Sequence, residues 1–233
     1  MFMAIENKKI SQIVIEQIQE MIMRGELKDG DQLPPERIMT EQFQIGRPAL
    51  REALKALEVL GLVERRHGLG NYIVNNVESN FFKPLSLSFK LSNGNVQEIL
   101  QLRYLIETFT VREAAKLATF DDISFLNQKQ KEMMEAETPD EKSQCDKDIH
   151  FKIARICNNS LILATFENAS YLLENFIDQA VHLSYFAEED SVERIYEEHK
   201  NIIDAIEKKD ADLAVSFINI HLNNIRPDLL HGI

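Results

Sequence analysis

The sequence of 233 residues lacks the segments that would place a protein in or across a membrane. It has no run of about 18 apolar residues, the length that a transmembrane helix requires. Its first residues, MFMAIENKK, lack the basic and then apolar pattern of a signal peptide. Cys145 and Cys157 are the only cysteines, so we expect two reduced, buried thiols on a helix rather than a disulfide. These absences predict a cytoplasmic protein with no membrane partner.

Positive charge is also scarce, which at first argues against a nucleic-acid-binding protein. The net charge is -12, but the acid is unevenly placed. Residues 1–75 carry ten Lys and Arg against eleven Asp and Glu, whereas residues 76–233 carry sixteen against twenty-seven. A local basic face in the nearly neutral first part is sufficient for contact with phosphates. Such a domain predicts modest affinity as a monomer and a need for dimerisation.

The pattern from Leu33 to Val74 predicts two short helices followed by a β-hairpin. Two prolines precede apolar residues at helical spacing, which indicates a helix that Gly46 ends. A second apolar stripe runs from there to Gly61, and two β-prone runs then flank a glycine-rich turn over residues 67–70. With an earlier helix over residues 10–23 closing the core, this order is that of a winged helix-turn-helix.

Basic residues gather on this motif. Arg47 and Arg51 are four residues apart, so they share one face near the start of the second helix, the end that enters the major groove. The planar fork of arginine pairs bidentately with guanine or with phosphate. A solvated pair of amphipathic helices is the alternative, but order, spacing and basic clustering favour DNA. The predicted contacts are Arg37, Arg47, Arg51, Arg65, Arg66 and His67.

Residues 8–75 resemble the N-terminal domain of the GntR family of bacterial transcription regulators. The matching positions are Leu33-Pro34, Glu36-Arg37, Phe43, Arg47, Arg51-Glu52-Ala53-Leu54, Leu57, Gly61-Leu62 and Gly68-x-Gly70. The resemblance implies that Arg37, Arg47 and Arg51 contact the operator and that the wing glycines approach the minor groove. It completes the predicted DNA-binding set with Pro48, Gly68 and Gly70. The chain has Gly46-Arg47-Pro48-Ala49 where the family usually has Ser-Arg-Thr-Pro, so the capping hydroxyls and the usual operator sequence are not carried over.

From about residue 95 onward the chain predicts six helices with short loops. They are expected to begin near Asn95, Asp121 or Asp122, Thr138, Ser160, Asp190 and Asp210, with the fourth reaching about Phe186. The Phe residues at 109, 120, 125, 151, 166 and 176 are expected in the core. We predict a mostly α fold: a winged helix-turn-helix domain over 1–76, a linker and the start of the second domain over 77–94, and an antiparallel all-α bundle over 95–233 for effector binding and dimerisation.

One carboxylate and three histidines of the bundle are candidates for a metal site. Asp146 and His150 are four residues apart and share a helix face, while His199 and His221 lie mid-way along the last two helices. This set suits zinc, nickel or a similar divalent ion within a bundle core. An Asp/His pair at this spacing also occurs by chance, and separate histidines are often ordinary core or surface residues. Spacing alone leaves both interpretations open.

Residues 96–222 resemble the effector domain of the FadR subfamily of GntR regulators. The matching pieces are Leu102-Arg103 with Glu107, Asp146-x-x-Ile149-His150, Asn159, His199-x-x-Ile202-x-x-Ala205-Ile206, and Ala214 leading to His221. The resemblance implies a divalent ion, zinc or nickel, on Asp146, His150, His199 and His221. It also implies that Arg103 binds a small carboxylate effector, although Arg103 could instead pair with Glu107 four residues on. Asn159 and His182 complete the predicted effector site, with a structural role open to His182.

The sequence therefore predicts a ligand-responsive DNA-binding regulator, a repressor that acts as a homodimer on a palindromic operator in double-stranded DNA. Its effector is expected to be a small organic acid. A metal-sensing regulator, with the ion as effector, is one alternative. A metal-dependent enzyme is another, but the chain has no HExxH motif and no nucleophile paired with a general base.

Overall fold

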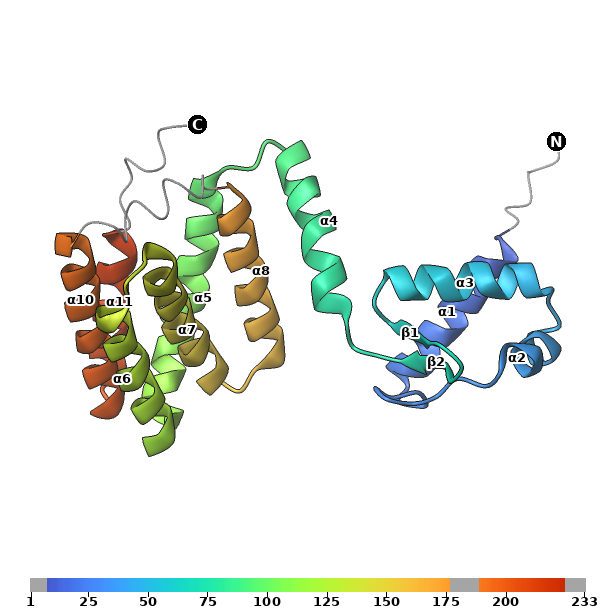
Figure 1. The fold of residues 1–233 in the computed structure, drawn as a ribbon, viewed down its shortest axis with the longest axis horizontal. Helices are drawn as coiled ribbons and strands as arrows, with labels where there is room; N and C mark the ends of the chain where they lie inside the picture. The colour runs from blue at the N-terminus through green and yellow to red at the C-terminus, as the bar shows by residue number, and fades with distance from the viewer. Residues whose placement is uncertain (1–7, 177–188, 225–233) are drawn as a thin grey trace, which may run out of the picture. The chain divides into compact units, whose positions relative to one another are not determined.

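The computed structural model describes residues 8–176 and 189–224. By their internal contacts the residues divide into two compact units, Met1–Leu87 and Ser88–Ile233 (Figure 1). The first unit contains α1 (Ile10–Met23), α2 (Glu36–Phe43), α3 (Arg47–Val59), β1 (Val63–Arg66), β2 (Gly70–Ile73) and the beginning of α4 (Val77–Leu91). The second contains the end of α4, α5 (Val96–Leu117), α6 (Phe120–Glu135), α7 (Pro139–Ile156), α8 (Ser160–Phe176), α10 (Glu189–Glu207) and α11 (Ala211–Asn223).

The first unit is a winged helix-turn-helix, and its core explains why α3 is held firmly. The apolar stripe of α3 faces inward, and Leu50, Ala53 and Leu57 are fully buried against α1, α2 and the hairpin. Burial of an aliphatic side chain contributes about 1.5–3 kcal/mol. The polar face of α3, with Arg47 and Arg51, is left exposed. The predicted fold class is confirmed for this unit.

The turn between α2 and α3 differs in detail from the prediction. Gly46 does not end α2: the helix stops at Phe43, and Gln44 adopts a left-handed conformation with φ of 54°. Gly46 is instead the N-cap of α3, in an extended conformation, and Pro48 lies in the first turn. The backbone of Gln44 thus adopts the rare positive φ. Gly46 caps the next helix and has no side-chain hydroxyl to bond its first amides.

The hairpin forms at the predicted place. β1 and β2 pair antiparallel, with Val63 opposite Ile73 and Arg66 opposite Gly70. Gly70 has φ of 110°, a conformation that side chains rarely adopt, so glycine is needed where the turn re-enters the strand. Val63 and Ile73 point into the core, while Arg65 and Arg66 remain exposed.

A helix occupies the stretch that the sequence pattern indicated as a linker. α4 begins at Val77, within the polar run of residues 75–80, and continues through Pro84 to Leu91. Polar residues and an internal proline conceal a helix from a periodicity argument. The division into units falls within this helix, after Leu87.

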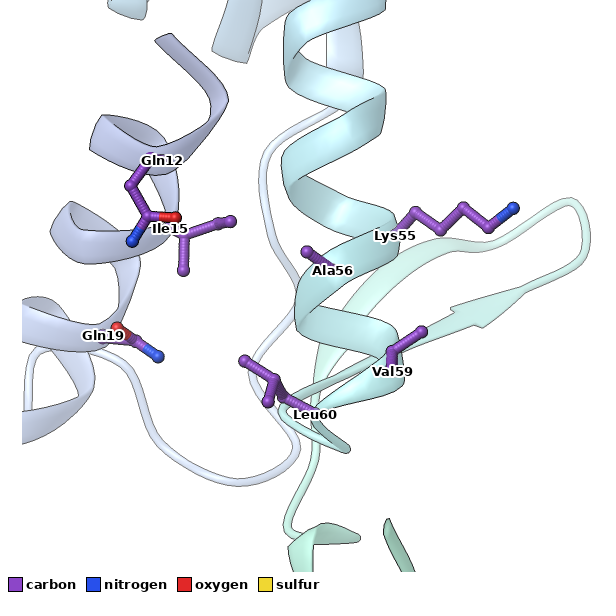
Figure 2. A pocket seen from close by; sticks show the side chains of 7 residues that line it. All are labelled: Gln12, Ile15, Gln19, Lys55, Ala56, Val59 and Leu60. Carbon is purple, nitrogen blue, oxygen red and sulfur yellow. The ribbon is translucent and has the colours of Figure 1, made fainter. Parts of the chain in front are cut away.

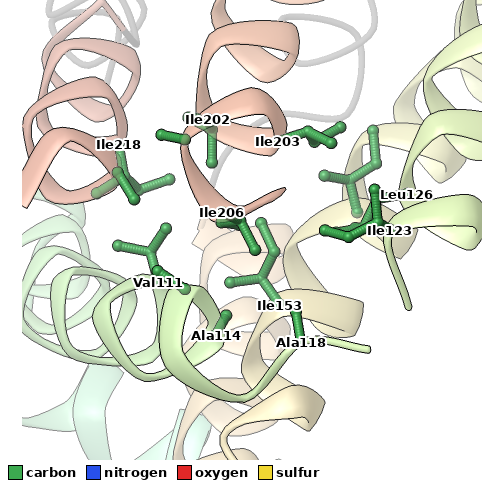
Figure 3. Close-up of a cluster of buried hydrophobic side chains, with 14 residues drawn as sticks. Val111, Ala114, Ala118, Ile123, Leu126, Ile153, Ile202, Ile203, Ile206 and Ile218 are labelled. Carbon is green, nitrogen blue, oxygen red and sulfur yellow. The ribbon is translucent and has the colours of Figure 1, made fainter. Parts of the chain in front are cut away.

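The second unit is an antiparallel bundle whose core is shared by five helices. Figure 3 shows this core, in which Val111 of α5, Ile153 of α7, and Ile203 and Ile206 of α10 converge. α5 packs on α7, α8 and α11, and α10 packs on α6 and α11. The predicted starts near Asn95, Thr138, Ser160 and Asp210 agree with helices α5, α7, α8 and α11.

Some expectations about the bundle are wrong. Thr119, rather than Asp121 or Asp122, is the N-cap of α6, whereas the described part of α10 begins at Glu189, in agreement with the expected start near Asp190. Phe109 and Phe120 are 46% and 83% exposed, although their spacing suggested core positions. Among the described residues α8 ends at Phe176, and the expected continuation to residue 186 lies outside them. Cys145 and Cys157 are free and buried, and no helix of the described chain is long and apolar enough to cross a membrane.

Candidate functional site

Four predicted ligands from three helices meet inside the bundle. Asp146 and His150 lie on α7, His199 on α10 and His221 on α11, and their ligand atoms all lie within 4.8 Å of one another. His150 Nε2 is 3.1 Å from His221 Nε2 and 3.4 Å from His199 Nε2. Asp146 Oδ1 is 3.4 Å from His199 Nε2. The three histidines are buried, so this is an internal site.

Two further carboxylates hold the outer nitrogens of these histidines. Glu107 Oε2 of α5 lies 2.6 Å from His150 Nδ1, and Glu198 Oε2 of α10 lies 2.7 Å from His221 Nδ1. A carboxylate beside Nδ1 favours the tautomer with the proton on Nδ1, which leaves a lone pair on each Nε2 that faces the centre. No described residue pairs with Nδ1 of His199, although that atom is buried.

This arrangement fits a divalent cation. If Glu107 and Glu198 fix the tautomers, the Nε2 lone pairs of His150 and His221 face each other at 3.1 Å. Lone pairs approach so closely only when a proton or a cation lies between them, and burial increases the cost of leaving them unpaired. Three imidazole nitrogens and one carboxylate oxygen form a donor set for zinc, nickel or a similar ion.

The charges around the site are strongly coupled. Burial tends to raise the pKa of Glu107, but Arg103 and the neighbouring histidines lower it to about 2. Burial tends to lower the pKa of His150, but the Glu107 carboxylate raises it above its usual value. For His199, burial and the two other imidazoles hold the pKa well below the usual value. Glu107 is therefore ionised and His199 neutral at neutral pH, the forms in which they support or bind a cation.

Neither of the two predicted effector residues that the structure describes, Arg103 and Asn159, is among the four converging groups. Arg103 Nε lies 2.7 Å from Glu107 Oε1, so its ion pair connects it to His150 through one carboxylate. Asn159 is exposed, and its side-chain oxygen accepts hydrogen bonds from the backbone amides of Leu161 and Ile162 at the start of α8. His182 lies outside the described residues.

The nine residues predicted to contact DNA are all exposed on the first unit. A hollow of about 290 Å³ brings Arg51 of α3 together with Arg65 of the wing. A second hollow, of about 400 Å³, is lined by Arg65, Arg66, His67, Gly68 and Gly70. Arg37, Arg47 and Pro48 line neither.

Several of these arginines already have acidic partners. Arg51 Nε lies 2.9 Å from Glu36 Oε2, and Arg37 Nη1 lies 2.9 Å from Glu41 Oε1. Arg66 Nε lies 2.7 Å from Glu64 Oε2. Within the described part of the chain, no such partner is recorded for Arg47 or Arg65. The acidic residues of the first unit, which we call the head, thus neutralise part of its basic face, in agreement with the nearly neutral charge of this unit.

Figure 2 shows another hollow of the first unit, about 440 Å³, between α1 and the end of α3. Gln12, Ile15 and Gln19 border it on α1, and Lys55, Ala56, Val59 and Leu60 border it on the other side. None of the residues predicted for DNA or effector binding lines this hollow.

The carboxylates that support the site are not predicted by the sequence pattern. Spacing predicts Glu107 only as a partner of Arg103, whereas its contact with His150 crosses from α5 to α7. Glu198 precedes His199 directly, yet it holds His221, 23 residues away. Spacing along one helix could not indicate either contact. A buried histidine does, however, require a partner at its second nitrogen, and this would have justified a search for acidic neighbours.

Both units of the chain are similar to known proteins. Residues 10–73 match the family described as bacterial regulatory proteins, gntR family, and residues 98–224 match the FCD domain. The chain is 32% identical over 213 residues to the HTH-type transcriptional regulator LutR of Bacillus subtilis strain 168, which covers 91% of this chain and 97% of that protein. It is also 32% identical over 231 residues to the HTH-type transcriptional repressor NanR of Escherichia coli strain K12, covering 94% and 83%. A solved structure, Streptococcus agalactiae GntR, has the same fold with a TM-score of 0.65 at 21% identity, covering 94% of this chain and 99% of that one.

Proposed function

The chain belongs to the gntR family of bacterial regulatory proteins, and from this premise we propose that it is a ligand-responsive transcriptional repressor whose FCD domain binds a divalent metal ion and a small organic acid. DNA binding and transcription regulation follow from the family. Repression is proposed by analogy with NanR, which is a repressor by name. LutR and NanR are regulators, so the enzyme alternative is set aside.

The metal proposal rests on one observation, the convergence of four ligand atoms within 4.8 Å. Asp146, His150, His199 and His221 would hold the ion, with Glu107 and Glu198 orienting two of the imidazoles. A bound divalent ion would supply a positive centre able to attract a carboxylate. The test is metal analysis of untagged protein, followed by thermal denaturation with added zinc or nickel. We expect one ion per subunit and a raised melting temperature; no ion and no stabilisation would contradict the site.

The effector proposal assigns Arg103 to the carboxylate of the organic acid. Arg103 is 11% exposed and pairs with Glu107, which in turn contacts His150. A ligand carboxylate that binds Arg103 must compete with Glu107. Ligand binding would therefore change the contact between Glu107 and His150. A ligand changes operator affinity only if it binds one conformation of the protein better than another. The coupled contacts of Glu107 provide a place where two such conformations can differ.

The ion pair of Arg103 with Glu107 also favours the alternative in which the metal ion itself is the signal. The Nε of Arg103 already donates to Glu107, and the four metal ligands need no further residue. Operator release measured with a chelator alone, and separately with a set of small carboxylates, distinguishes the two. Release by chelation but by none of the acids supports the metal sensor.

We further propose that the regulator acts as a homodimer on a palindromic operator. One head contacts few base pairs, and two heads related by symmetry double the contacts on a palindrome. The nearly neutral first unit limits the affinity of a single head for phosphates. Sedimentation should therefore find two chains per operator, and a monomer both free and on DNA would contradict this.

A further inference from the structure

One ion pair of the head joins the recognition helix to the helix before it. Arg51, on the exposed face of α3, donates from Nε to Glu36 Oε2 at 2.9 Å. The side chain of Arg51 is 61% exposed, but that of Glu36 is only 22% exposed. Glu36 is the first residue of α2, where a negative charge is favoured by the helix dipole. The carboxylate is therefore held in place by its own surroundings and can act as a fixed anchor.

The atoms used in this pair are important for base recognition. Guanine is recognised by two parallel N–H donors from one edge of a guanidinium group. The Nε of Arg51 is occupied by Glu36, and no described residue is recorded as a partner of its two terminal nitrogens. These two nitrogens form one intact edge of the fork. The ion pair thus leaves Arg51 with a single edge for a bidentate contact and limits the rotamers that the side chain can adopt.

The other paired arginines contact partners within their own element. Arg37 uses a terminal nitrogen, Nη1, to contact Glu41 one turn along the same helix. Arg66 donates from Nε, as Arg51 does, but its partner Glu64 lies in the same strand. Among the described DNA-facing arginines, only Arg51 has its partner on a different element. A contact between α2 and α3 fixes the side chain relative to the helix-turn-helix, whereas a contact within one element does not.

We propose that Glu36 is a positioning residue for base recognition: it holds Arg51 by Nε and presents the terminal edge of the guanidinium to guanine. The inference rests on the proposed function, in that Arg51 must face the major groove. Glu36 does not touch DNA in this assignment. It lines the hollows of about 290 and 400 Å³ that border Arg51 and the wing, so it lies between the two basic parts of the surface.

The test measures sequence preference rather than affinity alone. Wild-type full-length protein first enriches a preferred duplex from a random-sequence library. Affinities are then measured for that duplex and for every single-base-pair change. Arg51→Ala identifies the base pair that Arg51 recognises, where its preference should fall by about five-fold or more. Glu36→Ala should reduce the preference at that same base pair and leave the other positions unchanged.

Two further variants separate positioning from charge and from folding. Glu36→Gln retains a side-chain oxygen that can accept from Arg51 Nε, so it should keep most of the preference that Glu36→Ala loses. Glu58→Ala removes an equal charge from the same 290 Å³ hollow, and no described ion pair involves Glu58. It should strengthen binding to all duplexes alike, because a negative charge near the phosphates is lost.

The outcomes are distinguishable. If Glu36→Ala keeps the preference at the Arg51 base pair, or reduces preference evenly at every position, the positioning role is overturned. The same holds if Glu36→Gln and Glu36→Ala lose the preference equally. If the wild-type protein enriches no duplex, or Arg51→Ala changes no position, the proposed DNA-recognition surface itself is wrong. Thermal melts of each variant confirm that the comparison is made between folded proteins.

Discussion

One buried and one partly buried carboxylate connect the proposed metal ligands to the rest of the bundle. Glu107 is 3% exposed and contacts both Arg103 and His150, while Glu198 contacts His221 and Asn224. A carboxylate at the outer nitrogen of an imidazole fixes its tautomer and increases its basicity as a ligand. The affinity of the site for a metal ion therefore depends on residues that do not touch the ion.

Replacing these carboxylates should weaken the metal site. Glu107→Gln and Glu198→Gln should each lower metal affinity by about 10–100-fold, since a neutral amide does not increase the basicity of the imidazole as a carboxylate does. Competition with a chelator of known affinity provides the measurement. Glu197→Gln is the matched control, because Glu197 adjoins Glu198 but is 63% exposed, and its one ion pair among the described residues is with Lys200 at 4.0 Å. If all three variants bind the metal ion with equal affinity, Glu107 and Glu198 do not support the site.

Arg103 offers a second test at this scale. For any carboxylate that raises the melting temperature of metal-loaded wild-type protein, Arg103→Ala should lose most of that increase and still bind one ion. The reason is that Arg103 is not among the four converging ligands. Arg112→Ala is the control: Arg112 lies on the same helix, pairs with Asp212 and is 41% exposed. Loss of the response in both variants, or in neither, would contradict the effector role.

At the scale of elements, reciprocal caps determine where the bundle helices begin. Asn95 with Glu98, Thr119 with Asp122, and Thr138 with Glu141 each form a capping box. The second box also links two helices, because Asp122 Oδ1 lies 2.6 Å from Lys152 Nζ of α7. One carboxylate thus caps α6 and ties it to the helix that carries Asp146 and His150.

The pH dependence of this cap can be predicted. The Lys152 ammonium and the Thr119 hydrogen bonds lower the pKa of Asp122 from 3.8 to about 2. A lowered pKa stabilises the fold above the unfolded value, and this contribution is lost as pH falls from about 4 toward 2. Asp122→Asn should cost about 1 kcal/mol of unfolding free energy at pH 7, and the difference from wild type should shrink below pH 4.

Denaturant melts at pH 7 and at pH 3 measure this effect. Asp121→Asn is a close control, because Asp121 is the adjacent residue, is exposed, and has no recorded hydrogen bond or ion pair among the described residues. It should leave stability within about 0.5 kcal/mol of wild type. A pH-independent loss in Asp122→Asn would show that the charge of Asp122 does not contribute.

At the scale of the whole molecule, the head and the bundle have separate cores. The buried cluster of the head includes Val14, Leu50 and Ile73, and that of the bundle includes Val111, Ile153 and Ile206. The four proposed metal ligands all belong to the bundle. Metal binding should therefore stabilise one unit and have little direct effect on the core of the other.

Removal of the ion tests this separation. Calorimetry of chelated protein should show a lower melting temperature for the bundle transition and an unchanged transition for the head. The cause is the cluster of buried imidazoles around His199, which is costly to leave without a cation. His199→Ala should reproduce the chelated profile and no longer respond to chelator. A uniform shift of both transitions would indicate that the units unfold as one.

The local features of this protein follow from its amino-acid sequence. Helical periodicity and turn residues were sufficient for α1, the helix-turn-helix and most of the bundle, because each depends on neighbours along the chain. Residue types and the family resemblance identified the four candidate ligands that the structure brings together. The ion pair of Arg103 with Glu107 was also foreseeable from their spacing of four residues.

Which distant groups face one another depends on the tertiary structure. The contacts of Glu107 with His150, Glu198 with His221 and Glu36 with Arg51 join different helices. Helix α4 was hidden by its polar start, and Phe120 at the beginning of α6 is 83% exposed although its spacing suggested the core. Periodicity specifies which face of a helix is apolar, but packing decides what that face meets. The supporting carboxylates of the site depend on this second step.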